Sequence, residues 1–224
     1  MVDLVHSPHH DHYFAVAADP APPPSGAFVS KRLILLRHAK SAWEDQDIAD
    51  FDRPLSSRGR KAAPVIGAHL ARAGYVPDLV LCSSARRALE TLDLVVAGWQ
   101  RQPNVRKQKS LYLAMPREML KRVQTAGDDV GTVMLVGHNP GIADLANWLC
   151  HEGDATMRGA LSRKFPTGAV AVIDFDVEDW REVDADTGRL VGITVPSDNA
   201  LPGPNRRSTL APSSSTIAPP ARVL

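Results

Sequence analysis

Residues 33–41 read Leu33-Ile34-Leu35-Leu36-Arg37-His38-Ala39-Lys40-Ser41, which is four apolar residues followed by a mainly polar segment. Four apolar residues are too few for a helix and are typical of a buried strand in a sheet covered on both faces. Such a strand delivers the residues after it to the carboxyl edge of the sheet, where α/β proteins place their sites. We therefore expect Arg37 and His38 to lie side by side at that edge. A histidine nitrogen can attack phosphorus, and a neighbouring guanidinium can hold phosphate oxygens.

Composition restricts the class of protein. The chain has 224 residues, of which 44% are hydrophobic, enough for one domain of ordinary size with a sizeable core. Its net charge of +1 argues against a protein that binds nucleic acid through bulk charge. No apolar run approaches the length of a membrane span, so no membrane partner is expected. Cys82 and Cys150 lie far apart, so a disulfide framework is not expected and a reducing cytoplasm fits.

The two ends of the chain differ from its centre. Residues 1–30 are rich in histidine and proline, and residues 197–224 are rich in proline and serine. Both are expected to be disordered tails around a single domain at residues 31–196. No lysine or arginine precedes Lys31, so no secretory signal or transit peptide is visible. A metal site in the first tail is not expected, because its histidines lack acidic or cysteine partners at fixed spacing: His6, His9, His10 and His12.

Between the tails, short apolar runs alternate with helical segments. Strands are expected at residues 33–36, 79–82, 132–136, 168–175 and 189–195. Helices are expected from Ser56 or Ser57 to about Ala73, and at 85–97, 116–124 and 142–149. Strands that alternate with helices predict an α/β fold with a mostly parallel central sheet and helices on both faces.

Three of the expected strands end in polar clusters. The clusters are Arg37-His38, Ser83-Ser84-Ala85-Arg86-Arg87 and Gly137-His138. In a parallel sheet these strand ends converge on one edge, which would gather two histidines and at least two arginines around one small space. Phosphate suits such a space, because its oxygens match planar guanidinium groups. Ser83 and Ser84 are expected to cap a helix whose N-terminus points at the same space.

Other phosphate and metal sites fit the spacing less well. A cysteine phosphatase loop needs five residues between its cysteine and its arginine, whereas Arg86 and Arg87 follow Cys82 after three and four. No glycine-rich loop ends in Gly-Lys-Ser/Thr, which excludes a P-loop nucleotidase. A zinc site at His38 and His138 would need a third ligand, and the flanking arginines would repel the cation, so no metal is expected.

Three motifs in chain order resemble those of the histidine phosphatase superfamily, which has the phosphoglycerate-mutase-like fold. These are Arg37-His38-Ala39-Lys40-Ser41, Arg87-Ala88-x-x-Thr91 and Gly137-His138-Asn139-Pro140. The short length of the chain resembles the SixA-type phosphohistidine phosphatase branch, as does one further stretch with Gly59 behind it, Asp52-Arg53-Pro54-Leu55-Ser56. The resemblance covers about residues 31–196 and leaves out both tails.

The resemblance implies a role for each matching residue. His38 would be the nucleophile that becomes phosphorylated, and His138 a second catalytic histidine. Arg37 and Arg87 would bind the phosphate, and Arg87 fits the family spacing better than its neighbour Arg86.

Two positions depart from the family pattern. Many relatives have glycine where this chain has Ala39, and they often have glutamate where Lys40 stands. Lys40 should make the mouth of the pocket more basic and is a candidate substrate contact. Arg53 is a second candidate, although its position favours an exposed loop arginine.

The implied activity is a phosphatase, a hydrolase that works through a phosphohistidine intermediate and needs no cofactor. A leaving alkoxide would need a general acid, which larger members of the superfamily supply from an inserted segment. Here the carboxylates that could serve are few, and for each of them a solvated surface position is the favoured interpretation: Glu118 on a predicted helix, and the loop residues Glu44, Asp45, Asp47, Asp50 and Asp52. Phosphohistidine has a better leaving group and needs less acid help, which favours a histidine-phosphorylated protein as substrate. A phosphatase for a small metabolite such as a sugar phosphate, or a module that binds phosphate without turnover, are the alternatives.

Overall fold

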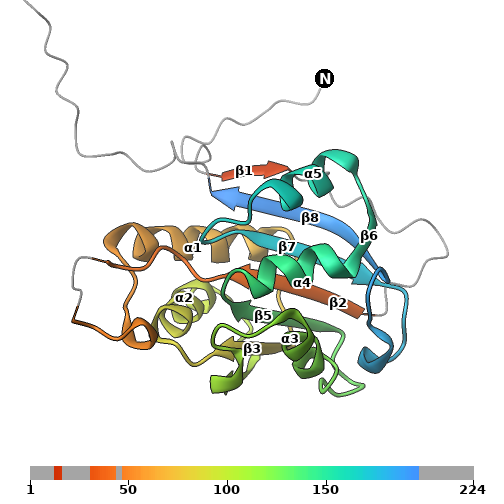
Figure 1. Ribbon diagram of the computed structural model, residues 1–224, viewed down its shortest axis with the longest axis horizontal. Helices are drawn as coiled ribbons and strands as arrows, with labels where there is room; N and C mark the ends of the chain where they lie inside the picture. Colours follow the sequence, from red (N-terminus) through yellow and green to blue (C-terminus); the bar gives the residue numbers. More distant parts are fainter. Residues whose placement is uncertain (1–12, 17–30, 44–46, 197–224) are drawn as a thin grey trace, which may run out of the picture.

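The computed structural model describes residues 13–16, 31–43 and 47–196, which form an eight-stranded sheet with helices on both faces (Figure 1). The strands lie in the order β1-β8-β7-β2-β5-β3-β4, and β6 pairs with β8. Their bounds are β1 (Tyr13–Val16), β2 (Lys31–Arg37), β3 (Leu79–Ser83), β4 (Asn104–Gln108), β5 (Thr132–Gly137), β6 (Cys150–Gly153), β7 (Val170–Phe175) and β8 (Gly188–Pro196).

The sheet is mostly parallel, as predicted, and antiparallel pairs occur on one side of it. Strands β2, β5, β3 and β4 run parallel to one another, as predicted, and β6 runs parallel to β8. The strands expected at 168–175 and 189–195 are present as β7 and β8, but β7 runs antiparallel to both β2 and β8. The chain between β7 and β8 contains one short 3-10 helix, η3 (Trp180–Glu182), so β8 returns directly beside β7 instead of crossing over.

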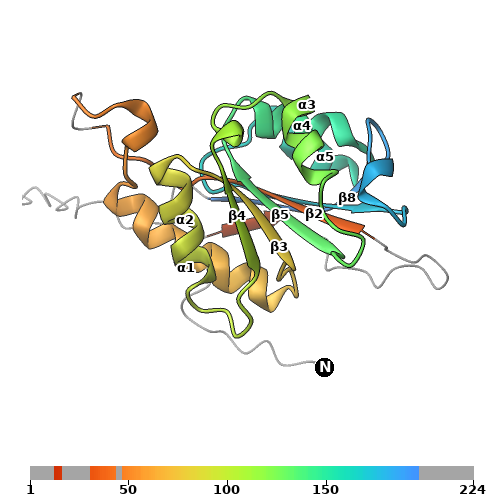
Figure 2. The same cartoon turned by 90° about the horizontal axis from the view of Figure 1, so that it is seen from below.

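Strand β2 lies in the middle of the sheet and is buried on both sides. The side chains of its four apolar residues alternate between two cores and are fully inaccessible to solvent. Leu33 and Leu35 belong to the core under α3 (Pro116–Val123), α4 (Gly141–Leu149) and α5 (Ala155–Arg163). Ile34 and Leu36 belong to the core under α1 (Ser57–Arg72) and α2 (Arg86–Val96). Figure 2 shows these two layers of helices on opposite faces, which confirms the expected covering of the sheet.

The helices expected from the sequence lie within two residues of α1, α2, α3 and α4, and Ser56 caps α1 by accepting a hydrogen bond from the Gly59 amide. The expected cap of α2 is wrong, because its N-cap is Ala85 and Ser83 ends strand β3. Neither β6 nor α5 was expected. No helix in the described ranges is long and apolar enough to cross a membrane.

The tails expected at 1–30 and 197–224 lie outside the described residues, apart from Tyr13–Val16. That segment forms β1 and pairs with β8 in antiparallel register.

The segment after β2 is anchored against the start of α1. The carbonyl of Lys40 accepts hydrogen bonds from the Ser56 amide at 2.9 Å and the Ser56 hydroxyl at 3.0 Å. Gly59 packs so closely on this carbonyl that a Cβ at residue 59 would lie 2.2 Å from the Lys40 oxygen. Glycine is therefore required there by close backbone approach, and the contact holds the chain two residues beyond His38.

We expect Gly59→Ala to lower the free energy of unfolding by about 1–3 kcal/mol, because the added methyl meets main chain that cannot turn away. Urea denaturation measures the loss. Gly159→Ala is the matched control, since Gly159 lies in α5 with nothing within 4 Å of an added Cβ. Alanine there should raise the free energy of unfolding by roughly 0.5–1 kcal/mol. Equal changes at the two positions would contradict the steric explanation.

Candidate active site

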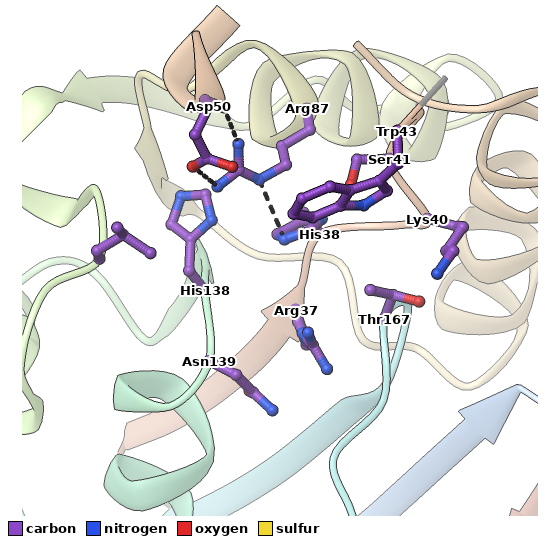
Figure 3. Close-up of a pocket in the computed structure, with 11 residues that line it drawn as sticks. Arg37, His38, Lys40, Ser41, Trp43, Asp50, Arg87, His138, Asn139 and Thr167 are labelled. Atoms are coloured by element: carbon purple, nitrogen blue, oxygen red, sulfur yellow. Dashed lines mark hydrogen bonds and ion pairs between the residues drawn. The ribbon is translucent and has the colours of Figure 1, made fainter. Parts of the chain in front are cut away.

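The ends of β2, β5 and β3 converge on one edge of the sheet, and a pocket of about 510 Å³ opens there. Figure 3 shows how the polar side chains around it point toward one another. Four residues that the sequence singled out, Arg37, His38, Arg87 and His138, line this pocket together with Lys40. The other lining residues are Ser41, Trp43, Asp50, Leu113, Asn139 and Thr167.

His38 follows the last residue of β2 and is 6% exposed. Its Nδ1 lies 2.8 Å from the backbone carbonyl of Ala39, which can only accept, so Nδ1 carries the proton. The opposite nitrogen, Nε2, accepts a hydrogen bond from Arg87 Nε at 3.2 Å. The imidazole is therefore held at both nitrogens, with its free electron pair on Nε2 and facing the guanidinium.

His138 follows β5, and its ring lies 5.1 Å from the ring of His38 between centroids. Its Nε2 is 2.8 Å from the hydroxyl of Ser83, the last residue of β3. Its Nδ1 is buried and has no hydrogen-bond partner among the described residues. A buried ring nitrogen without a partner is costly, which indicates that a ligand meets it in the working protein.

Both imidazoles are uncharged at neutral pH. Burial lowers the pKa of His38 to about 4; the bond to the Ala39 carbonyl opposes the shift, and the charges of Arg87 and Arg37 add to it. Burial, together with the neighbouring His38 and Arg87, lowers the pKa of His138 to about 3. A neutral imidazole keeps the electron pair that a nucleophile needs.

Arg87, in the first turn of α2, connects the histidine to the loop over the pocket. While its Nε donates to His38, its Nη1 donates to the Asp50 carbonyl and its Nη2 donates to the Asp50 carboxylate at 2.9 Å. The same carboxylate accepts from the Tyr112 hydroxyl at 2.7 Å. Burial raises the pKa of Asp50, but the hydrogen bonds from Tyr112 and Arg87 outweigh it and hold the pKa below its ordinary value.

Thr91, one turn along α2, connects that helix to the backbone at Ala39, directly after His38. Its hydroxyl donates to the Arg87 carbonyl at 2.6 Å and accepts from the Ala39 amide at 3.0 Å. The Arg87-x-x-x-Thr91 spacing therefore lets one hydroxyl hold both the Arg87 carbonyl and the Ala39 amide in place.

Arg37 is held by the segment that precedes β7. Its Nη1 donates to the Phe165 carbonyl at 2.9 Å, and the Asn139 side-chain amide donates to the same oxygen at 2.9 Å. Arg37 Nε is buried and has no hydrogen-bond partner within the described part of the chain. The pocket thus holds a second buried polar atom that lacks a partner, and this one belongs to a cation.

The two candidate substrate contacts occupy different places. Lys40 is exposed and lines the pocket. Arg53 does not line it: its side chain is 13% exposed, and its guanidinium lies over the ring of Trp43, 4.4 Å from the centroid. Arg53 Nε is also 3.7 Å from the carboxylate of Asp50.

Of the carboxylates considered as general acids, Asp50 lines the pocket. Glu118 lies on α3 and pairs with Arg122 at 2.5 Å, while Glu44 and Asp45 lie outside the described residues. Because its pKa is lowered, Asp50 is ionised at neutral pH and accepts hydrogen bonds instead of donating a proton. The described residues contain no group of three or more histidine, cysteine, aspartate or glutamate side chains that could hold a metal.

Comparison with known families places this pocket in context. The family model of the histidine phosphatase superfamily (branch 1) matches residues 33–111, the part that runs from β2 through α2 to Leu111. An uncharacterised protein of Mycobacterium tuberculosis (strain H37Rv) is 38% identical over 163 residues, which is 72% of this chain and 99% of that protein.

Two solved structures are similar over most of the chain. One is the candidate phosphohistidine phosphatase SixA of Nakamurella multipartitia, with 28% identity, a TM-score of 0.64, and coverage of 74% of this chain and 96% of that one. The other is the candidate phosphohistidine phosphatase SixA of Agrobacterium tumefaciens, with 30% identity, a TM-score of 0.60, and coverage of 73% and 96%.

We expect the rings of His38 and His138 to stay uncharged as the pH falls from 7 to 5. Histidine side-chain ¹H–¹⁵N spectra measure this, with signals assigned from His38→Gln and His138→Gln. Because both pKa values lie below the ordinary value of about 6.5, the folded protein binds fewer protons than the unfolded chain. The free energy of unfolding should therefore fall as the pH falls from about 6.5 toward about 4. An imidazolium signal from either ring above pH 6 would contradict the assignment.

We also expect the Ser83 hydroxyl to donate to His138 Nε2, which leaves the ring proton on Nδ1, facing the pocket. Ser83→Ala should then change the tautomer seen in the same spectra and lower kcat about tenfold, because a buried nitrogen loses its partner. Ser84→Ala, at the next residue, is the control and should change neither. An unaltered tautomer in Ser83→Ala would show that Ser83 does not orient His138.

Proposed function

This chain belongs to the histidine phosphatase superfamily, and from that membership we propose that it hydrolyses phosphohistidine in proteins through a covalent phosphohistidine on His38. The observation that carries the proposal is the state of His38: a neutral, buried imidazole whose free electron pair faces an arginine, in a pocket that other cationic side chains also line. That arrangement supports nucleophilic catalysis more directly than simple binding of phosphate.

In the first step, the phosphoryl group of the substrate occupies the pocket. Its oxygens accept hydrogen bonds from Arg37 Nε and His138 Nδ1, which are two of the buried atoms that lack a partner within the described residues. Arg87 Nε transfers its hydrogen bond from His38 Nε2 to a phosphoryl oxygen, which frees the electron pair of Nε2. This nitrogen then forms a bond to phosphorus in line with the bond that breaks, and the breaking electron pair goes to the substrate nitrogen.

In the second step, water hydrolyses the intermediate. The oxygen of water bonds to phosphorus, the P–N bond to His38 breaks, and its electron pair returns to Nε2. The proton released by water leaves with the phosphate or enters solvent. Throughout, the Ala39 carbonyl holds the proton on Nδ1 and stabilises the positive charge that the phosphorylated ring carries.

The choice of phosphohistidine follows from the leaving group. An alkoxide would have to be protonated as it leaves. Among the described residues that line the pocket, the carboxylate is that of Asp50, which is ionised and bound to Arg87 and Tyr112. A phosphorylated imidazole that carries a proton on its second nitrogen leaves as a neutral molecule and needs no acid. A sugar-phosphate phosphatase is the alternative, and it would need a proton donor from elsewhere.

The test compares hydrolysis of a histidine-phosphorylated protein with hydrolysis of a panel of phosphate monoesters that includes sugar phosphates, with and without a metal chelator. We expect the protein to be the preferred substrate, and His38→Ala to reduce its hydrolysis by at least about a thousandfold. An acid-labile, alkali-stable phosphoenzyme should be trapped in the wild type and be absent from His38→Ala.

His151→Ala is the matched control, because His151 is exposed on β6. His38→Gln and circular dichroism of each variant separate a loss of chemistry from a loss of fold. Preference for a sugar phosphate would overturn the proposed substrate, and activity that persists without His38 would overturn the mechanism. If no substrate is hydrolysed, the pocket is one that binds phosphate without turnover.

A further inference from the structure

Large apolar side chains are exposed at the mouth of the pocket. Among the described residues, four large apolar side chains are exposed, and two of them, Trp43 and Leu113, line the pocket with 61% and 52% of their surface accessible. A third, Met115, follows Leu113 by two residues and is 66% exposed. We refer to Trp43, Leu113 and Met115 as the apolar rim. The fourth, Val105, lies on strand β4 and does not line the pocket.

Leu113 is held in a backbone conformation that leucine rarely adopts, with φ at 50°. Its neighbours are fixed on both sides: Leu111 and Ala114 are buried, and the Tyr112 hydroxyl is bonded to Asp50. Unfavourable backbone conformations persist at functional sites, where the surroundings impose them. Here the result is an exposed aliphatic side chain beside the phosphate pocket.

Trp43 is exposed, but its ring is held in place by a neighbouring side chain. Its ring lies against the guanidinium of Arg53, whose own side chain is largely buried and close to Asp50. An aromatic ring stacked in this way is positioned before any partner arrives, which reduces the entropy lost on binding.

We propose that the apolar rim is the docking surface for the protein that carries the phosphohistidine, an inference that rests on the proposed function above. Cationic groups of Arg37, Arg87 and Lys40 lie in the pocket, and the rim beside them is apolar. This pattern complements an anionic phosphoryl group that projects from an apolar patch of a protein surface. A sugar phosphate presents hydroxyl groups, which exposed carbon atoms of tryptophan, leucine and methionine cannot pair with.

The short reach of a phosphohistidine from its protein also supports a docking surface at the rim. A phosphohistidine projects from its protein by the length of one imidazole, so a phosphoryl group that reaches His38 must bring the surrounding protein surface against the mouth. Trp43 and Leu113 are the large apolar side chains it would meet there, and exposed apolar side chains around a binding site are typical of interaction sites.

The test uses two substrates that share the same P–N bond: a histidine-containing phosphotransfer domain phosphorylated on its histidine, and free phosphohistidine. The readout is the ratio of the two kcat/KM values. We expect Leu113→Asn, Leu113→Gly and Met115→Gln each to lower this ratio about tenfold relative to the wild type. Asparagine and glycine both accept the backbone conformation of Leu113, so these variants keep the fold. Val105→Ser is the matched control and should leave the ratio unchanged.

The outcomes distinguish this inference from the function on which it rests. A wild-type enzyme that hydrolyses neither substrate overturns the proposed function and the docking surface together. A wild-type enzyme that hydrolyses both with equal kcat/KM, or rim variants that change the ratio no more than Val105→Ser does, overturns the docking surface alone. A ratio that falls in the rim variants, with circular dichroism unchanged, supports it.

Discussion

The site depends on keeping the imidazole of His38 uncharged while a guanidinium lies against it. The hydrogen bond from Arg87 Nε to His38 Nε2 can form only when Nε2 carries a free electron pair. Burial supplies that condition, because it disfavours the charged ring more than the Ala39 carbonyl favours it. Once neutral, the histidine can accept from the arginine that would otherwise repel it, and the two groups can share one small space.

The fold supplies this space by its strand order. Parallel strands β2, β5 and β3 are neighbours, so the residues after them meet at one edge of the sheet. The antiparallel side of the sheet contributes as well, because the segment before β7 presents the Phe165 carbonyl to Arg37. Helix α2 then carries Arg87 and Thr91 on successive turns, so a single helix positions the guanidinium and the backbone at Ala39, next to His38.

The parts of this arrangement that follow from local sequence were predictable. The apolar run at β2 and the polar residues after three strands indicated the sheet and the gathering of two histidines with arginines, and the resemblance to the family selected Arg87 over Arg86. The long-range hydrogen-bond partners of the site residues were not predictable. Ser83 was predicted to cap a helix, because it lies between a strand and a helix. Its contact with His138 spans 55 residues and could not be predicted from the local sequence. Asp50 looked like one of several loop carboxylates, and only the folded loop brings it to Arg87. The direction of β7 likewise depends on tertiary packing rather than on its own residues.

The charges of the pocket have a consequence for the end of the reaction. With both histidines neutral, the described residues that line the pocket hold the cations of Arg37, Arg87 and Lys40 against the one carboxylate among them, that of Asp50. This excess of positive charge is suited to any phosphate dianion and does not distinguish one that is still attached to a substrate from one already released. Inorganic phosphate, the product, therefore competes for the same groups. The turnover of such a site is tied to the phosphate concentration around it.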